Sequence, residues 1–334
     1  ALYMLLFMGK ARYMVTDNAV ALLKRAGKGG MSGFVNAFLR RFDVNAVPMP
    51  AGDEGESIRF SYPLFAVKLL KKQYGARAES IMTAESRGVT VRFERGEENY
   101  LSRPHFRSTF PHTFIFPNFT RDEGFFAGDY TFQSVGSIAI CHGVEPCERL
   151  LDACAAPGGK SVLLSQKCGT VTAFELHPHR AELIRQYASR MHRENIEVFC
   201  RDSSVFDESR QDAFDGVLCD VPCSGMGTVA ENPDVKLNRT EGDLISLHKV
   251  QLSVLETCAR YVKKGGALYY STCSVFACEN DDVVGEFLQN NPAFSVERTQ
   301  NPLPHEDTAY GMQFLPDEAF GAGFYFCKLR RAAE

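Results

Sequence analysis

Residues 151–160 read Leu-Asp-Ala-Cys-Ala-Ala-Pro-Gly-Gly-Lys and decide the fold class of this 334-residue chain. The apolar start of the run predicts a buried strand, and the small residues and paired glycines predict a tight loop leading into a helix. Such a loop lets the backbone approach a ligand closely at the carboxyl edge of a parallel sheet. The run is neither G-x-G-x-x-G nor G-x-x-x-x-G-K-[ST], which disfavours a dinucleotide fingerprint and a phosphate-binding P-loop. A tight turn without a ligand is the alternative.

The rest of the C-terminal part follows the same pattern. Predicted strands alternate with predicted helices, which indicates a parallel sheet with crossover helices and hence the α/β class. The expected strands cover residues 150–154, 171–176, 197–200, 216–220, 267–271 and 323–329. The expected helices cover residues 160–166, 180–192, 244–262 and 280–290.

The sequence upstream of this sheet predicts two smaller parts. Apolar stripes over residues 1–42 predict helices, and segment 43–57, with its Pro and Gly residues, predicts a linker. A helix at 64–74 and a strand at 89–93 predict a small α+β unit. We therefore expect domains at residues 1–45, 58–125 and 126–334. Because Ala1 lies inside an apolar stretch, we also expect further residues before it.

Charge is distributed unevenly along the chain. The 37 Lys and Arg and 41 Asp and Glu residues give a net charge of −4, which by itself argues against a polyanionic partner. Residues 1–50, however, carry seven basic and two acidic residues, so the N-terminal part is the expected polyanion-facing region. No apolar run approaches the ~20 residues of a membrane span, and no secretory leader is recognisable. We expect a soluble, cytoplasmic protein.

Two of the eleven cysteines follow predicted strand ends. The motifs are Asp220-Val221-Pro222-Cys223-Ser224-Gly225 and Tyr270-Ser271-Thr272-Cys273-Ser274. Because parallel strands end at one edge of a sheet, Cys223 and Cys273 are expected to converge on one crevice with Asp220. No pair is spaced C-x-x-C, so no metal site is expected. Reduced packing residues are expected at Cys141, Cys168, Cys200, Cys219, Cys258 and Cys327.

Carboxylates follow two further strands. Glu175 ends the strand after the quoted run, about 20 residues on, where an acid accepts hydrogen bonds from the ribose of an adenosine-type cofactor. Asp202 follows the third strand, within reach of an adenine amino group. For both residues the alternative is a strand-end carboxylate without a ligand.

In this order and spacing, the three motifs resemble those of the RNA cytosine-5 methyltransferases that use S-adenosylmethionine. The resemblance covers residues 61–331, and residues 34–41 resemble the tail of the NusB-like helical domain of the branch that modifies small-subunit ribosomal RNA. It implies a Rossmann-like methyltransferase fold, preceded by a small α+β domain and the remnant of an all-α domain. It also implies S-adenosylmethionine as cofactor, no metal, and RNA as partner, above all 16S ribosomal RNA. We expect a monomer.

The resemblance further implies residue roles. Cys273 would be the nucleophile that adds to carbon 6 of cytosine, Asp220 would position the base, and Cys223 would assist product release. Lys160 and the cofactor's positive charge would favour the thiolate. The implied cofactor contacts are Cys154, Ala155, Ala156, Pro157, Gly158, Gly159, Lys160, Glu175, Asp202 and Asp220. The chain departs from the family where Glu175 replaces an aspartate and where Gln133-Ser134 replaces Gln-Asp.

A target base must leave its stack, so a basic path to the crevice is expected. Its candidate residues are Arg40, Arg41, Lys71, Lys72, Arg103 and Arg107. A nicotinamide-dependent dehydrogenase would need the missing G-x-G-x-x-G. A tRNA cytosine-5 methyltransferase and a catalytically silent RNA-binding ribosome-assembly protein remain open alternatives.

Overall fold

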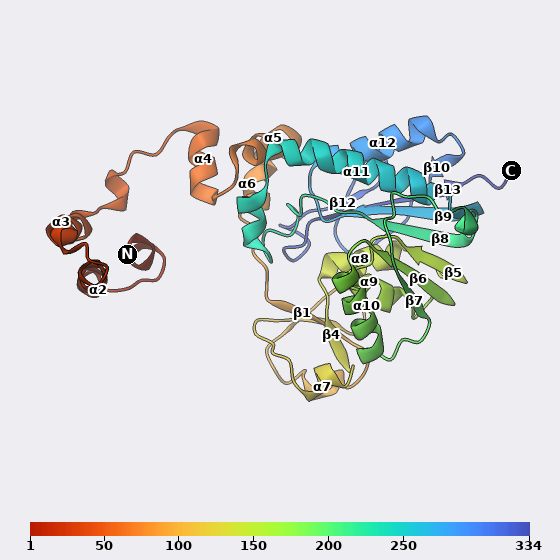
Figure 1. Cartoon of the computed structure of the whole chain (residues 1–334), viewed down its shortest axis with the longest axis horizontal. Helices are drawn as coiled ribbons and strands as arrows, with labels where there is room; N and C mark the ends of the chain where they lie inside the picture. Colours follow the sequence, from red (N-terminus) through yellow and green to blue (C-terminus); the bar gives the residue numbers. More distant parts are fainter. The chain divides into compact units, whose positions relative to one another are not determined.

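The computed structural model describes residues 1–334, which divide into two compact units, residues 1–55 and 56–334 (Figure 1). The boundary expected between residues 125 and 126 falls inside the second unit. The two units are described separately.

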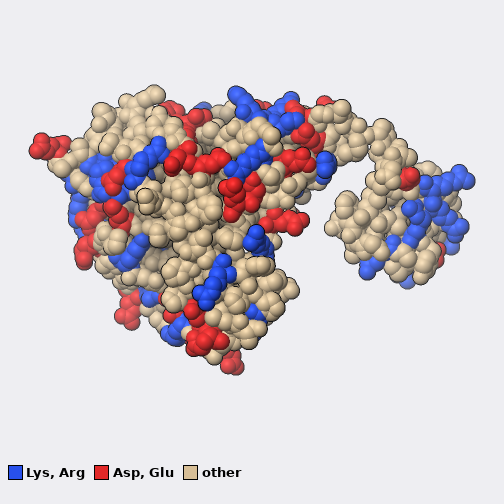
Figure 2. Space-filling view, turned by 180° about the vertical axis from the view of Figure 1, so that it is seen from behind, with Lys and Arg blue, Asp and Glu red and all other residues tan.

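The first unit is helical, with α1 (Leu2–Leu6), α2 (Arg12–Arg25) and α3 (Ser32–Arg41). Arg12 Nη1 donates to the carbonyls of Leu39 (2.7 Å) and Phe42 (2.9 Å), which ties the start of α2 to the end of α3. In Figure 2 the Lys and Arg side chains gather densely on this unit.

The segment predicted as a linker is partly helical, so that prediction was wrong at its C-terminal end. Helix α4 (Gly52–Phe60) begins there, and it carries Asp53 and Glu54 in its first turn and Arg59 in its last. Charges in these places favour a helix through its dipole. The glycines and acidic residues that indicated a linker thus serve as a helix start.

A four-stranded antiparallel sheet opens the second unit's α/β part. Its strands are β1 (Val89–Phe93), β2 (Phe106–Arg107), β3 (Thr113–Phe116) and β4 (Tyr130–Phe132), in the order β2-β3-β1-β4. The strand expected at 89–93 is confirmed. A short helix, α7 (Glu123–Phe126), leads into β4.

Helices α5 (Leu64–Tyr74) and α6 (Ala78–Met82) precede this small sheet in the chain but pack elsewhere. Their buried residues, such as Leu70 and Ile81, share an apolar cluster with Met226, Val275 and Leu315 from loops of the larger sheet. The helix predicted at 64–74 is confirmed. The segment that it packs against could not be predicted from the sequence, because residues such as Val275 lie about 200 positions away.

The larger sheet has the order β11-β12-β13-β9-β8-β5-β6-β7, with β10 paired to β13. Five strands are parallel: β5 (Arg149–Asp152), β6 (Thr170–Glu175), β7 (Ile196–Cys200), β8 (Phe214–Asp220) and β9 (Val262–Thr272). Strand β13 (Phe324–Arg331) lies antiparallel to β9. The expected Rossmann-like α/β fold is confirmed.

Three short strands of the larger sheet were not predicted, namely β10 (Phe294–Val296), β11 (Glu306–Asp307) and β12 (Met312–Phe314). Segments of two or three residues are too short to show a period of two, so their sequences carry no strand signal.

Helices cover both faces of this sheet (Figure 1). On one face lie α8 (Val135–Gly143), α9 (Gly159–Leu164) and α10 (Pro178–Arg190). On the other lie α11 (Glu241–Ala259) and α12 (Asp281–Asn290). Successive strand residues alternate between the two cores, as Leu218 and Cys219 do. None of the helices combines the length and apolar composition needed to cross a bilayer.

Candidate active site at the carboxyl edge of the larger sheet

A cavity of about 690 Å³ opens where β5 and β8 end. Its walls come from the loop after β5, the end of β8, the loop after β9, and the end of β4 in the small sheet. The lining includes Phe132, Gln133, Ser134, Asp152, Cys154, Ala155, Ala156, Pro157, Gly159, Lys160, Tyr187, Asp220, Glu231, Asn232, Cys273 and Phe324. Open α/β sheets bind their ligands at this edge.

The loop after β5 forms one wall because its residues are small. Gly158 has a φ of +108°, a left-handed conformation that glycine adopts most easily. A Cβ there would stand only 3.2 Å from the backbone of Ile184 on α10. Helix α9 starts at the next residue, so Gly158 permits both the turn and the close approach of this loop to α10.

Lys160 and Asp220 form a largely buried ion pair inside the cavity. Lys160 Nζ lies 2.7 Å from Asp220 Oδ2, and the side chains are 15% and 22% exposed. Ser271 Oγ donates to the other carboxylate oxygen at 2.7 Å. Burial lowers the pKa of Lys160, but the carboxylate of Asp220 outweighs it and raises that pKa overall. The ammonium therefore stays charged beside the cavity.

The two predicted cysteines meet. Cys223 Sγ and Cys273 Sγ are 3.1 Å apart, and both are free thiols. The backbone N–H of Cys273 donates to Cys223 Sγ at 3.3 Å. Cys273 lines the cavity, whereas Cys223 stands behind it and is absent from the lining. Contact with Cys273 and burial raise the pKa of Cys223 well above its usual value, so this thiol keeps its proton.

Asp152, the last residue of β5, is a cavity residue that the sequence analysis did not single out. Burial raises the pKa of its carboxyl group to about 6. Ser161 Oγ donates to Oδ2 at 2.6 Å, but Oδ1 is buried without a partner. A buried carboxylate oxygen without a partner is costly unless a ligand supplies a donor. The sequence did contain a signal for this residue, since Asp152 is an acidic residue at the end of a predicted apolar strand, near the start of the run 151–160.

Three predicted cofactor residues, Glu175, Asp202 and Gly158, are absent from the lining of this cavity. Glu175 ends β6, where its carboxylate accepts a hydrogen bond from the His177 backbone (3.0 Å) and faces Arg180 (3.4 Å). Asp202 Oδ1 accepts from the backbone (2.8 Å) and the hydroxyl (2.7 Å) of Ser204. The structure thus unites most of the predicted loop with Lys160, Asp220 and Cys273, but not Glu175 or Asp202.

The remaining cavity wall comes from segments with weaker sequence signals. Gln133 and Ser134, where the chain departs from the family pattern, both line the cavity, and Ser134 also caps α8 through the backbone N–H of Ser137. Glu231 also lines the cavity; this residue is exposed, and desolvation raises the pKa of its carboxyl group.

The chain is similar to known methyltransferases. Residues 140–330 match the family described as 16S rRNA methyltransferase RsmB/F. The chain is 30% identical to the probable ribosomal RNA small subunit methyltransferase B of Bacillus subtilis, over 94% of this chain and 77% of that protein. It is 29% identical to the ribosomal RNA small subunit methyltransferase B of Xanthomonas campestris, over 94% and 75%.

Solved structures show the same fold. A methyltransferase homologue from Pyrococcus horikoshii superposes with a TM-score of 0.72 at 22% identity, covering 85% of this chain and all of that one (100%). NSun6 from the same organism, crystallised with SFG, gives a TM-score of 0.69 at 17% identity, covering 80% and 97%. The chain therefore belongs to the RsmB/F family of 16S rRNA methyltransferases, whose methyl donor is S-adenosylmethionine.

Proposed function

We propose that the protein methylates carbon 5 of a cytosine in 16S ribosomal RNA, through a covalent adduct between Cys273 and carbon 6 of the base. One observation carries the proposal: Cys273 opens into the same cavity as the Lys160–Asp220 pair while a second, protonated thiol touches it from behind. Methylation of a ring nitrogen or a ribose oxygen gives no reason for two thiols at this place.

The cavity fits S-adenosylmethionine. The small side chains of Ala155 and Ala156 leave room along the loop after β5. The unpartnered Asp152 Oδ1 suits the ammonium group of the methionine end, since an ionised acceptor and a charged donor form a strong hydrogen bond. Bound S-adenosylmethionine supplies an electrophilic methyl group. Glu175 and Asp202, at the ends of the neighbouring strands, are proposed contacts to ribose and adenine.

The chemistry needs a nucleophile because carbon 5 of cytosine is too weakly nucleophilic to attack a methyl group unaided. The Cys273 thiolate forms a bond to carbon 6, and the electron pair of the 5,6 double bond becomes available at carbon 5. Carbon 5 then takes the methyl group, the donor's bond to that methyl breaks to leave S-adenosylhomocysteine, and a base removes the proton from carbon 5 as the bond between Cys273 sulfur and carbon 6 breaks. The double bond returns and Cys273 leaves as a thiolate.

The neighbouring residues have matching roles in the proposal. Asp220 holds the base at its ring nitrogen and amino group, and Lys160 and Ser271 fix the orientation of that carboxylate. Lys160 and Cys273 line the same cavity. Cys223, which retains its proton beside Cys273, assists the release of the methylated product.

RNA must reach this cavity with the target base unstacked. The first unit, with its excess of Lys and Arg, and the exposed Arg103 and Arg107 near the small sheet are the proposed phosphate contacts. Both arginines also lie over aromatic rings, Arg103 over Tyr100 (5.1 Å) and Arg107 over Phe114 (5.4 Å). We further propose that the enzyme acts as a cytoplasmic monomer.

Bisulfite sequencing of total RNA tests this function. In cells that lack the protein, one cytosine of 16S ribosomal RNA is expected to lose its methyl group. The wild-type gene restores the mark and the Cys273→Ala gene does not. Loss of a tRNA mark instead would identify the transfer RNA alternative, and an unchanged methylation map would identify a silent RNA-binding protein.

A further inference from the structure

A buried carboxylate joins the two cysteine loops. Glu279 ends the 3-10 helix η7 (Ala277–Glu279) and is fully buried. Its Oε1 accepts hydrogen bonds from the Ser224 backbone (2.7 Å) and Gln251 Nε2 (3.1 Å). Its Oε2 accepts from the hydroxyls of Ser224 (2.6 Å) and Ser274 (2.5 Å). Four uncharged donors thus compensate the carboxylate for the loss of water.

The bonded serines directly follow the two active-site cysteines in the sequence. Ser224 follows Cys223, and Ser274 follows Cys273, so one carboxylate holds the residue next to each thiol. The two hydroxyls are themselves 3.3 Å apart. Because the two loops are 50 positions apart in the chain, a tertiary contact must set the distance between their thiols.

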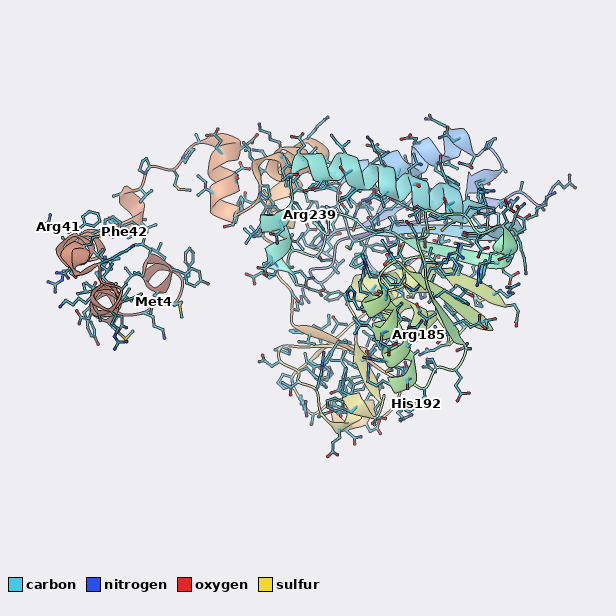
Figure 3. The ribbon with its side chains drawn as sticks, viewed as in Figure 1. Met4, Arg41, Phe42, Arg185, His192 and Arg239 are labelled. Carbon is cyan, nitrogen blue, oxygen red and sulfur yellow. The ribbon has the colours of Figure 1, made fainter.

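Other side chains in this region hold only one of the loops. Arg239, labelled in Figure 3, donates to the carbonyls of Cys223 (3.3 Å) and Ser224 (2.9 Å). Gln251 donates to the carbonyl of Pro222 (2.9 Å). Asn280 donates to the carbonyl of Ser274 (3.1 Å). Glu279 is distinguished from these three because it bonds to both loops.

Given the proposed two-cysteine reaction, we propose that Glu279 is a positioning residue that sets the separation between the Cys223 and Cys273 thiols. The negative charge of Glu279 also affects the thiol of Cys223. After contact with Cys273 and burial, the negative charge of Glu279 further raises the pKa of Cys223. Lys160 lies on the cavity side, near Cys273. Cys223 therefore keeps its proton, and Cys273 is the thiol that lines the cavity.

Three variants separate this role from a general need for the buried acid. Glu279→Gln keeps the shape, since its amide oxygen accepts from the Ser224 backbone and Gln251 while its amide nitrogen donates to the serine oxygens. Glu279→Ala removes the carboxylate's hydrogen bonds to both loops and leaves the direct bonds between the loops, from the Cys273 N–H to Cys223 Sγ and from the Gly227 N–H to the Cys273 carbonyl. The matched control is Glu286→Gln, an exposed acid on α12 that pairs with His248 at 2.9 Å.

The direct measurement is thiol bridging. Dibromobimane links two cysteines only when their sulfurs are close, and peptide mass spectrometry identifies the Cys223–Cys273 bridge. The wild type, Glu279→Gln and Glu286→Gln are expected to bridge equally, whereas the bridged fraction falls several-fold in Glu279→Ala. A folded Glu279→Ala protein that bridges like the wild type would overturn the proposal.

Kinetics provide the second measurement. In Glu279→Ala, kcat is expected to fall about ten- to a hundred-fold with KM for RNA unchanged, since the displaced thiols act in the reaction and not in RNA binding. Glu279→Gln should recover most of that loss. If Glu279→Ala does not fold, Glu279→Asp replaces it, because an acid shorter by one methylene cannot reach both serines. Wild-type bridging and kcat in that variant would contradict the role.

The bridging experiment uses the protein without RNA or cofactor. It therefore tests the position of the thiols whether or not cytosine is the substrate. If Cys273→Ala kept full methylation while Glu279→Ala lost bridging, the reaction would be wrong and the positioning role would stand.

Discussion

The two ends of the parallel sheet carry the same chemical groups in different surroundings. At the carboxyl edge stand the Cys223–Cys273 pair and the Lys160–Asp220 ion pair. At the amino edge, Cys147 Sγ lies 3.7 Å from Cys168 Sγ, and Lys263 Nζ lies 2.6 Å from Asp215 Oδ1. Asp215 and Asp220 even belong to the same strand, β8.

The surroundings decide which set has chemistry to perform. The carboxyl-edge ion pair is 15% and 22% exposed and borders a cavity of about 690 Å³. The amino-edge pair is 41% and 31% exposed, and its cavity measures only about 230 Å³. At the carboxyl edge, the loop after β5 supplies the small residues, and the loops after β8 and β9 supply Cys223 and Cys273. Two neighbouring thiols therefore do not by themselves identify an active site. Their position at the carboxyl edge of the sheet, beside a large cavity, does.

The strongest test of the difference between the two edges is to remove one cysteine from each. Cys273→Ala is expected to lower methyl transfer at least about a thousand-fold, because the nucleophile is lost, while cofactor binding survives. The measurement is tritium release from cytosine labelled at carbon 5. Cys168→Ala at the amino edge should remain close to wild type, and equal activities of the two variants would remove the proposed distinction.

The same strand offers a matched pair of aspartates. Asp220→Asn is expected to reduce kcat/KM about a hundred-fold, since it weakens a contact to the reacting base and leaves the Lys160 ammonium without its counter-charge. Asp215→Asn at the other end breaks a partly exposed pair and should change stability by at most ~1 kcal/mol and activity hardly at all. Steady-state kinetics and thermal melts measure both variants. A similar loss in both would show that the ion pairs act on folding alone.

Removing Cys223 should slow turnover less than removing Cys273, but it should leave a detectable reaction intermediate. Cys223→Ala is expected to accumulate the covalent enzyme–RNA adduct, seen as a denaturant-resistant band on a gel, because release is impaired while addition is not. The Cys223→Ala, Cys273→Ala double variant should show no band. A Cys223→Ala protein that turns over without any adduct would refute the release role.

Asp152 gives the smallest effect and tests the cofactor end of the cavity. Its folded pKa of about 6 exceeds the unfolded value, so the folded state holds its proton more tightly and stability falls as pH rises through about 4 to 6. Asp152→Asn should therefore stabilise the unliganded protein at pH 7 by about 1–3 kcal/mol and flatten this pH dependence in thermal melts.

The same substitution is expected to weaken binding of S-adenosylhomocysteine about ten-fold or more, since a hydrogen bond between charged groups is worth ~1.5–3 kcal/mol. Calorimetric titration measures this affinity, with Asp215→Asn as the control. Unchanged affinity in Asp152→Asn would mean that the ammonium group binds elsewhere.

Much of the fold was readable because parallel strands with crossover helices leave local signals. Each parallel strand contains a short apolar run that ends at a polar or glycine-containing loop, and four of the five were expected within two residues of their observed bounds. The fifth, β9, begins at Val262, five residues before the expected start and at the last residue of the helix predicted over 244–262, because α11 already ends at Ala259. The short strands β10, β11 and β12 were not, since they are too short to show a period of two, and the docking of α5 and α6 was not, since it depends on partners distant in sequence. The acidic start of α4 was mistaken for a linker because glycine and acids suit both.

The sequence by itself determined the parallel sheet, the loop of small residues after β5, and the choice of Asp220, Cys223 and Cys273 as strand-end residues, because each is encoded within about ten neighbouring positions. Only the tertiary structure decided that the two thiols touch, that Asp152 keeps an unpartnered oxygen in the cavity, and that Glu279 joins the two cysteine loops. These are relations between segments far apart in the chain. Packing and burial establish them, and no local pattern records them.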